Sequence, residues 1–326
     1  MKVYIFTEGG SKFGYGHVVR CSSLYSELEN RGIDVEYIIN GNEEVVEVLG
    51  DKKHMVRNWL STDYLSTILN NEVYAIVDSY LANFGIYEYI SKHTKKSLFI
   101  DDNMRLTYPK GIVVNPSIYA KELKYPQIKG VHYLLGNEYV ILRGSFFDSK
   151  RETLKTEVKE ILVTLGGADI RNITPKILDI LNTEYPNVVK NVVIGKGFKN
   201  IEEIKRIDDK NISYYYNVNG IEMKALMLRS DMAISAAGQT IYELIKTETP
   251  FIPIRIIDNQ ENNVKGLLKY NLVNRVLDSE SSNFTKELSN EIRLLMNLEN
   301  RTILYNSMKG IIDGLGRTRI IDELLM

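Results

Sequence analysis

Residues 3–30 have the sequence VYIFTEGGSKFGYGHVVRCSSLYSELEN, which joins an apolar run, a glycine-rich segment and an amphipathic stretch. The run Val3–Thr7 is continuously apolar, as is typical of a parallel strand buried on both faces. The stretch Val18–Asn30 places apolar side chains at helical spacing, and Gly32 follows as a stop signal. A strand, a glycine loop and a helix in this order predict the opening unit of an α/β fold.

The same alternation continues to the end of the chain. Further strands are expected at Val35–Ile39, Ala75–Asp78, Ser97–Asp101, Ile112–Asn115, His132–Leu135, Ile161–Leu165, Asn191–Ile194, Ile212–Tyr216, Met232–Ser235, Phe251–Ile254 and Val273–Val276. A charged, apolar-poor stretch at 148–159 interrupts the pattern and predicts a linker. We therefore expect two Rossmann-like domains, 1–150 and 151–326, with the nucleotide bound by the second.

Composition excludes several classes of function. The 326 residues carry a net charge of −1, which offers no electrostatic surface for nucleic acid and no polybasic membrane anchor. The single cysteine, Cys21, and four scattered histidines predict neither a disulfide nor a metal site. The chain lacks an apolar run of about 18 residues, so we expect no membrane insertion and a cytoplasmic location. We expect no cofactor, and the sequence leaves the oligomeric state open.

The first candidate site is Gly14-Tyr15-Gly16-His17, between the first strand and the first helix. Glycines allow a tight turn and close approach of a ligand, and the helix start presents unpaired N–H groups. The loop delivers His17 to the carboxyl edge of the sheet, where ligands of open α/β sheets bind. The motif alone is equally compatible with an ordinary turn, and the position at strand one favours function.

The second and third candidate sites follow strands of the second domain. Gly166-Gly167 is either another loop for close approach or a plain turn. Ala237-Gly238-Gln239-Thr240 opens a helix whose first N–H groups, with the Thr240 hydroxyl, suit a diphosphate. Glu243, one turn further on, suits the two ribose hydroxyls, or it complements the helix dipole. The amides of Asn259 and Gln260 suit a sugar or uracil, although a capped helix start is the simpler explanation of this segment taken alone.

Taken together, these motifs resemble GT-B-fold nucleotide-sugar enzymes, with two Rossmann-like domains whose parallel sheets face a central cleft. The chain is most similar to the UDP-sugar hydrolases of pseudaminic acid biosynthesis and their spore-coat polysaccharide relatives, and more distantly to peptidoglycan N-acetylglucosaminyltransferases. The matching segments, besides the four sites above, are Arg20-Cys21, Val77-Asp78-Ser79-Tyr80, Ile100-Asp101-Asp102, Val114-Asn115-Pro116, Leu135-Gly136-Asn137-Glu138-Tyr139, Ala168-Asp169 and Ile312-Asp313-Gly314-Leu315-Gly316-Arg317. Ala237-Gly238 stands where many relatives have Gly-Gly, and it keeps a small residue there.

The resemblance implies hydrolysis of UDP-2,4-diacetamido-2,4,6-trideoxy-β-L-altropyranose to the free sugar and UDP, with His17 as general base and Arg20 among the binding residues. An unperturbed histidine pKa near ~6.5 suits that role. Asp78 and Tyr80 are candidates for orienting His17 or the sugar. Asp101, Asp102, Asn115 and Tyr139 are expected on the same rim, with structural caps as the simpler explanation.

Two other functions compete with a hydrolase. A glycosyltransferase of the same fold would pass the sugar to an acceptor. An apolar or basic patch beside the GYGH loop, suited to a lipid or glycan acceptor, would favour this function. The segment Ser11–Phe13 is only mildly amphipathic. A non-catalytic sugar-nucleotide sensor would not require a base such as His17.

Overall fold

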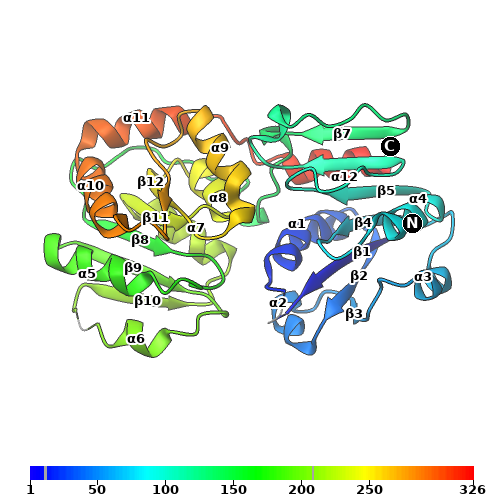
Figure 1. Ribbon diagram of the computed structural model, residues 1–326, viewed down its shortest axis with the longest axis horizontal. Coiled ribbons are helices and arrows are strands. Elements are labelled where there is room, and N and C mark those ends of the chain that lie inside the picture. The colour runs from blue at the N-terminus through cyan, green and yellow to red at the C-terminus, as the bar shows by residue number, and fades with distance from the viewer. Residues whose placement is uncertain (11–12, 208) are drawn as a thin grey trace. The chain divides into compact units, whose positions relative to one another are not determined.

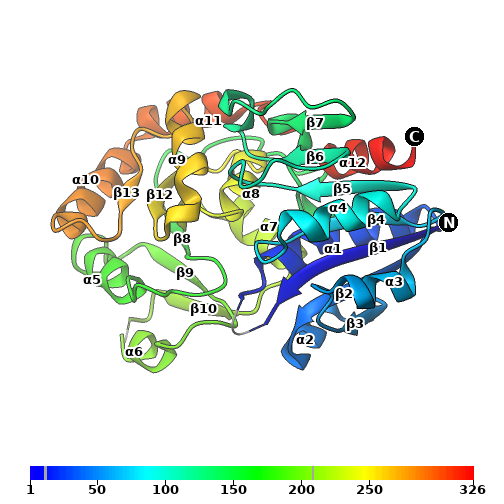
Figure 2. The ribbon, with the colours of Figure 1, turned by 45° about the vertical axis from the view of Figure 1, so that its right-hand side comes forward.

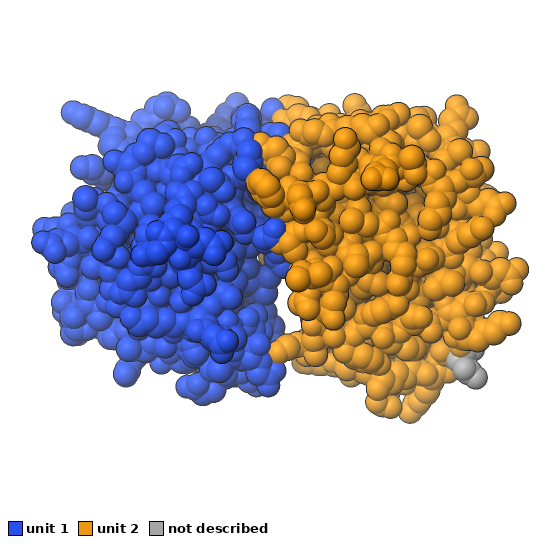
Figure 3. Space-filling view, turned by 180° about the vertical axis from the view of Figure 1, so that it is seen from behind, with its two compact units in different colours: residues 1–144, 314–326 blue, residues 145–313 orange. Residues whose placement is uncertain are grey.

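The computed structural model describes residues 1–10, 13–207 and 209–326, so Ser11 and Lys12 of the segment before the GYGH loop lie outside it. The chain forms two compact units: unit 1 comprises residues 1–144 and 314–326, and unit 2 comprises residues 145–313 (Figure 3). Each unit is a parallel sheet with helices, as Figure 1 shows. The expected α/β class with two parallel sheets is confirmed; the facing of the sheets across a cleft stays a prediction.

Unit 1 contains a seven-stranded parallel sheet of order β3-β2-β1-β4-β5-β6-β7. Its strands are β1 (Lys2–Gly9), β2 (Asp34–Gly41), β3 (His54–Val56), β4 (Tyr74–Asp78), β5 (Lys96–Ile100), β6 (Gly111–Asn115) and β7 (Val131–Leu135). Its α-helices are α1 (Gly16–Asn30), α2 (Val46–Leu49), α3 (Thr62–Ile68), α4 (Phe84–Lys92) and α12 (Gly316–Leu325).

Unit 2 contains a six-stranded parallel sheet of order β10-β9-β8-β11-β12-β13. Its strands are β8 (Glu160–Thr164), β9 (Val189–Ile194), β10 (Ile212–Tyr216), β11 (Met232–Ala236), β12 (Phe251–Arg255) and β13 (Leu277–Asp278). Its α-helices are α5 (Thr174–Glu184), α6 (Ile201–Lys205), α7 (Gly220–Arg229), α8 (Thr240–Lys246), α9 (Glu261–Lys269), α10 (Phe284–Met296) and α11 (Leu298–Met308).

The two faces of the unit 1 sheet bury alternate side chains, as the pleat of a strand requires. Val3 and Ile5 of β1 pack in one core cluster with the apolar face of α1. Phe6, on the opposite face, packs in a second cluster with Trp59 and Tyr87. A sheet buried on both faces produces the continuous apolar runs seen in the sequence.

The C-terminal helix α12 belongs to unit 1, whereas the sequence analysis assigned it to the second domain. Ile320, Ile321 and Leu324 are fully buried in the cluster that also contains Val3 and Ile5. Figures 1 and 2 show α12, in red, beside β5 of unit 1. The apolar face of this helix therefore completes the core of the first unit.

The charged segment 148–159 packs on unit 2, and the division of the chain falls before it, between residues 144 and 145. Arg151 is 5% exposed and donates to the carbonyl oxygens of Met227 and Ser230 at 2.6 and 3.0 Å. The sequence shows that this segment is charged but not that one of its guanidinium groups is buried against carbonyl groups. The segment was therefore predicted to be a linker, and the domain boundary was placed after residue 150 instead of after residue 144.

Candidate functional site

The strand order reverses at the same place in both sheets. In unit 1 the chain moves from β1 outward to β2 and β3, then returns to β4 on the other side of β1. In unit 2 the corresponding neighbours are β8 and β11. Ligands of open α/β sheets bind outside the carboxyl ends of strands at such a switch point. The GYGH loop follows β1 and Gly166-Gly167 follows β8, so both lie at these points.

The glycine loop of unit 1 closes on itself before α1 begins. The Gly10 and Gly14 backbones exchange N–H···O bonds of 3.1 and 2.8 Å, and both residues have positive φ, +117° and +76°. A β-carbon placed on Gly14 or Gly16 would meet no atom of the described residues within 4 Å, so these two positions leave room for a ligand beside the described part of the loop. Tyr15 packs against the core of unit 1, and its hydroxyl lies 3.4 Å from a carboxylate oxygen of Glu44.

His17, the second residue of α1, contacts the last residue of β4. Its Nδ1 lies 2.7 Å from Oδ1 of Asp78, and the Asp78 side chain is only 1% exposed. Because a carboxylate accepts hydrogen bonds, Nδ1 is the protonated nitrogen and Nε2 carries the lone pair of the neutral ring. Of the two roles foreseen for Asp78, the geometry provides contact with His17, because so buried a carboxylate is closed to a sugar.

Arg20, one turn further along α1, joins two carboxylates. Its Nε and Nη2 donate to Asp78 at 2.9 and 2.6 Å. Its Nη1 and Nη2 donate to Asp102 at 2.5 and 3.1 Å. Arg20 is only 7% exposed. Its buried positive charge is therefore balanced by the two carboxylates to which it donates. Arg20 thus joins Asp78 and Asp102 beside His17, and the binding role expected of it from the sequence stays a prediction.

Tyr80 covers the histidine from the loop after β4. The two rings meet edge to face with centroids 4.6 Å apart. The Tyr80 hydroxyl donates to Oδ2 of Asp102 at 2.6 Å, and the residue is 37% exposed. Asp102, expected as a structural cap, is therefore the second carboxylate of the network. Asp101 and Asn115 do cap loops: Asp101 accepts from the Asn103 and Arg105 N–H groups at 3.4 and 3.3 Å, and Asn115 accepts from the Ser117 N–H at 3.0 Å.

The electrostatics of this cluster favour an ionised Asp78 beside a basic imidazole. Burial opposes charge on Asp78, yet Arg20 and His17 together hold the pKa of that carboxyl well below its usual range. Burial also disfavours charge on His17, but the Asp78 carboxylate outweighs it and raises the pKa of His17. Burial and Asp102 raise the pKa of the Tyr80 hydroxyl, which keeps it a donor.

In unit 2, the loop after β8 approaches the loop after β9 closely. The Gly167 carbonyl oxygen accepts from the Gly197 N–H at 2.8 Å, and a β-carbon on Gly195 would lie 2.5 Å from that oxygen. Gly166 has φ +77°, and β-carbons on Gly166 and Gly167 would meet no atom within 4 Å in the part of the chain that the structure describes. The Gly195-x-Gly197 pair was missed in the sequence, although a Gly-x-Gly after a strand is a recognisable signal. Asp169 instead caps α5, accepting from Ile173 N and Thr174 N at 2.9 and 2.8 Å.

The segment Ala237–Thr240 joins β11 to α8. The Ala237 N–H donates to the Ile254 carbonyl at 2.8 Å and is used in the sheet. Among the described residues, no backbone carbonyl accepts from the N–H groups of Gly238, Gln239 and Thr240. The Asn263 side chain donates to the Ala237 carbonyl at 2.8 Å and fixes the loop from α9. Asn263 was not singled out from the sequence, where it is one of several amide residues in a row.

The remaining predicted binding residues of unit 2 occupy different environments. Glu243 lies in the first turn of α8 and is 7% exposed. Gln260 is 8% exposed, and its Oε1 accepts from the Ile256 N–H at 2.8 Å. Its Nε2 would lie 3.6 Å from a β-carbon on Gly238, so α8 and the start of α9 meet at this loop. Asn259 is exposed to solvent.

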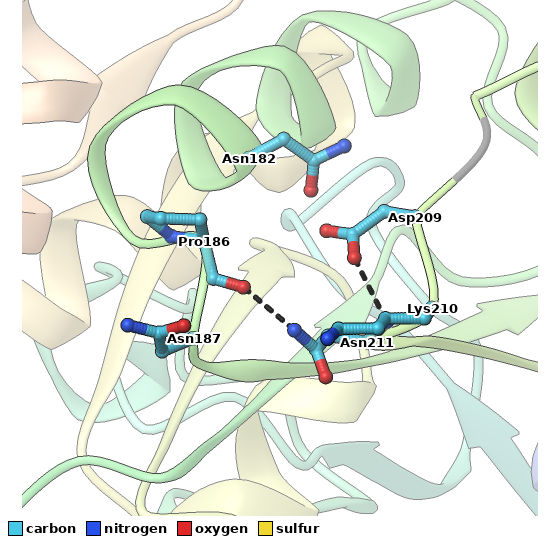
Figure 4. Close-up of a pocket in the computed structure, with 6 residues that line it drawn as sticks. All are labelled: Asn182, Pro186, Asn187, Asp209, Lys210 and Asn211. Atoms are coloured by element: carbon cyan, nitrogen blue, oxygen red, sulfur yellow. Dashed lines mark hydrogen bonds between the residues drawn. The ribbon is translucent and has the colours of Figure 1, made fainter.

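A cavity of about 560 Å³ lies at the opposite edge of the unit 2 sheet. It is lined by Asn182, Pro186, Asn187, Asp209, Lys210 and Asn211, which precede β9 and β10 or end α5 (Figure 4). The Asn211 amide donates to the Pro186 carbonyl at 2.7 Å, as Figure 4 shows. The cavity is at the amino ends of the strands and shares no residue with the glycine loops.

The described residues offer neither a metal site nor a membrane-spanning helix. No group of three or more histidine, cysteine, aspartate or glutamate side chains converges as ligands of a metal ion would, as far as the structure describes the chain. No described helix combines the length and the apolar character that crossing a membrane requires.

The chain is similar to three curated proteins. It is 29% identical over 273 residues to an uncharacterised protein of Methanocaldococcus jannaschii, covering 77% of this chain and 55% of that protein. It is 28% identical over 250 residues to the pseudaminic acid cytidylyltransferase and UDP-2,4-diacetamido-2,4,6-trideoxy-β-L-altropyranose hydrolase of Helicobacter pylori, covering 76% and 43%. It is 26% identical over 277 residues to the spore coat polysaccharide biosynthesis protein SpsG of Bacillus subtilis, covering 81% and 80%. The chain thus spans about half the length of the first two relatives.

Solved structures share the fold. MurG of Acinetobacter baumannii matches with a TM-score of 0.64 at 13% identity, over 100% of this chain and 99% of that one. The UDP-GlcNAc 2-epimerase of Neisseria meningitidis, bound to UDP-GlcNAc, matches with a TM-score of 0.65 at 15% identity, over 100% of both chains. No family model matches the chain. The resemblance inferred from the motifs is confirmed: the chain is similar in sequence to a pseudaminic acid pathway UDP-sugar hydrolase and to SpsG, and it has the fold of MurG and the UDP-GlcNAc epimerase.

Proposed function

We propose that the protein is an enzyme that hydrolyses a UDP-activated 2,4-diacetamido-2,4,6-trideoxy sugar to the free sugar and UDP. The observation that carries this proposal is the His17–Asp78 pair at the switch point of unit 1, with Nδ1 held at 2.7 Å by a buried carboxylate. Similarity to the Helicobacter pylori protein, whose name includes this hydrolase activity, supports the substrate class. The chain matches less than half of that protein, so the activity is carried over as a proposal.

In the proposed reaction, His17 acts as general base through Nε2. Nε2 accepts a proton from water while the water oxygen bonds to the anomeric carbon, and the bond from that carbon to the UDP oxygen breaks. The positive charge on the imidazole is stabilised by Asp78, and Arg20 keeps Asp78 ionised and in place. Tyr80 limits the rotation of the ring through its edge-to-face contact.

The departing UDP would be held by unit 2. The free N–H groups of Gly238, Gln239 and Thr240 offer hydrogen bonds to a diphosphate at the carboxyl end of β11, with Gly166-Gly167 on the neighbouring β8. Glu243 is proposed to accept from the ribose hydroxyls, and Asn259 and Gln260 to contact the base or the sugar. Donors fixed before the reaction stabilise the leaving group without reorganisation.

A second candidate function is transfer of the sugar to an acceptor. The observation that favours it is the presence of three exposed apolar side chains in the segments that follow β4 and β5: Leu81, Phe84 and Met104 are 43, 44 and 37% exposed. Arg105 joins these segments by donating to the Ser79 and Ala82 carbonyls at 3.1 and 2.9 Å. Exposed apolar side chains suit contact with another molecule, such as an acceptor.

The test that separates the two is UDP release from the 2,4-diacetamido sugar nucleotide in plain buffer, with and without an added glycan acceptor. We expect UDP and free sugar to form in equal amounts without an acceptor. Release that depends on the acceptor would favour the glycosyltransferase, and binding of the sugar nucleotide without any release would favour a sensor.

Glu243→Ala is expected to weaken UDP binding by about 1–3 kcal/mol, because a charge-assisted hydrogen bond to the ribose is lost. Isothermal titration of UDP into the variant measures the change. The matched control is Glu202→Ala, an exposed glutamate on α6 of the same unit, which should bind as the wild type does. Equal UDP affinity in both variants would remove Glu243 from the proposed site.

Turnover is expected to survive EDTA, because the proposed diphosphate site offers backbone N–H groups to the charge of the leaving group. The measurement compares initial rates of UDP release before and after dialysis against EDTA. A rate that falls and is restored by Mg²⁺ or Mn²⁺ would contradict this arrangement.

A further inference from the structure

Glu8 is a buried carboxylate at the carboxyl end of β1, on the strand that leads into the GYGH loop. It is 2% exposed, although the strand ends at the edge of the sheet. Glutamate is rarely buried to this degree without a paired partner, since removal of a carboxylate from water is costly. Glu8 therefore does not serve to keep the surface soluble, and its burial needs another explanation.

The two oxygens of the Glu8 carboxylate differ in their surroundings. Oε1 accepts a hydrogen bond from the backbone N–H of Tyr80 at 2.5 Å. Oε2 is buried and has no hydrogen-bond partner among the described residues. A buried oxygen left without a donor costs about 1–3 kcal/mol, and such groups persist chiefly where they serve a site.

The bond to the Tyr80 N–H acts on the ring that covers His17. It fixes the backbone from which the Tyr80 side chain extends, and that ring lies edge to face on the imidazole at 4.6 Å. Helix α1 supplies His17 itself, so α1 and the loop after β4 meet through this ring contact. Glu8 thus sets the position of Tyr80 relative to His17 without touching the imidazole.

The charge of Glu8 also acts on His17. The side chains that influence the imidazole are Asp78 on β4, which raises its pKa, Arg20 on α1, which lowers it, and Glu8 on β1, which raises it, all against the opposing effect of burial. Tyr80 and Asp102 join this group through their hydrogen bond, and Cys21 contacts Asp78 at 3.5 Å.

We propose that Glu8 is a positioning residue of the His17 site: it fixes Tyr80 against the imidazole through the Tyr80 N–H, and its carboxylate adds a second negative charge beside His17. The first part stands on the hydrogen bond and the ring contact. The second stands on the burial of the Glu8 carboxylate and on its bond to the backbone of Tyr80, the residue whose ring contacts the imidazole. The role deepens the proposed function, but it concerns the protonation of one side chain and does not depend on which reaction that side chain catalyses.

The test is an NMR pH titration of the histidine rings in the whole protein without substrate. The His17 signals are assigned by their absence in His17→Asn. In Glu8→Gln, the amide oxygen still accepts from Tyr80 while the charge is lost, so we expect the His17 midpoint at lower pH and unchanged ring-current shifts. The displacement should be smaller than in Asp78→Asn, because Asp78 touches the ring. Glu8→Asp keeps the charge but shortens the side chain, so the ring-current shift should change while the midpoint stays near that of the wild type.

Glu248→Gln is the matched control, because Glu248 in unit 2 is also buried and also has one oxygen without a partner among the described residues. We expect it to leave His17 unchanged. The signals of His54, His93 and His132 report whether each variant is folded. A His17 midpoint that is the same in Glu8→Gln, Glu248→Gln and the wild type would overturn the charge effect. Unaltered ring-current shifts in Glu8→Asp would overturn the positioning of Tyr80. Neither result depends on whether the sugar nucleotide is hydrolysed.

Discussion

His17→Asn is expected to lower turnover by about 10²–10⁴-fold, the usual contribution of a general base. Asparagine can still accept or donate at the position of Nδ1, so contact with Asp78 is retained while the basic Nε2 is lost. The affinity for UDP alone should change little, because the proposed nucleotide contacts are in unit 2. The measurements are the rate of UDP release and a UDP titration of the same preparation.

Reaction in ¹⁸O-labelled water locates the bond that breaks. If water attacks the anomeric carbon, the label appears in the released sugar, whereas label in UDP would mean attack at phosphorus. The matched control is His132→Asn, on β7, whose side chain is 60% exposed; it should retain the wild-type rate. A His17→Asn protein that turns over as fast as this control would remove His17 from the mechanism.

Asp78→Asn is expected to lower kcat/KM by about 10³-fold or more, because the amide does not stabilise the protonated imidazole and can select the wrong tautomer. In the wild type, the rate should rise as pH increases through the raised pKa of His17, since the neutral ring is the base. In the variant, burial still disfavours the charged ring and the carboxylate is gone, so the pKa of His17 falls. The rising limb of the pH profile should therefore move to lower pH.

Exposed Asp63→Asn, on α3, is the control for removal of a carboxylate from unit 1. Because Asp78→Asn leaves Arg20 with fewer acceptors, a thermal melt of each variant must show that it is folded at the assay temperature. An unchanged pH limb in a folded Asp78→Asn protein would show that this carboxylate does not set the protonation of His17.

The sequence predicted most of the sheet because burial on both faces leaves continuous apolar runs. The strand expected at Ala75–Asp78, for example, lies within one residue of the observed β4, Tyr74–Asp78, whose five residues are all buried. The short strand β3 was missed, because three residues are too few for a periodic signal. The last strand was expected at Val273–Val276 but lies at Leu277–Asp278, since a two-residue edge strand is defined by pairing with β12 and not by its own composition.

The location of the candidate site could be predicted from the sequence more completely than the contacts among its residues. A histidine on a glycine loop after β1 is a local signal, so His17 could be identified. Contacts between residues far apart in the chain carry no local signal: Arg20 reaches Asp102 across 82 positions, and Glu8 reaches Tyr80 across 72. For this reason the ion pair between Arg20 and Asp102 was not foreseen. Aspartates at strand ends cap loops so often that the exception requires three-dimensional neighbours.

The return of α12 to unit 1 has a consequence for biosynthesis. A ribosome releases residues 1–144 first, but Ile320, Ile321 and Leu324, which fill the core beside α1, emerge after all of unit 2. Unit 2 is continuous in the chain and can fold while it is being synthesised. Until α12 is synthesised, the apolar faces of the unit 1 sheet and of α1 are incompletely covered. A chain halted before residue 314 should therefore bind chaperones through unit 1, which contains His17.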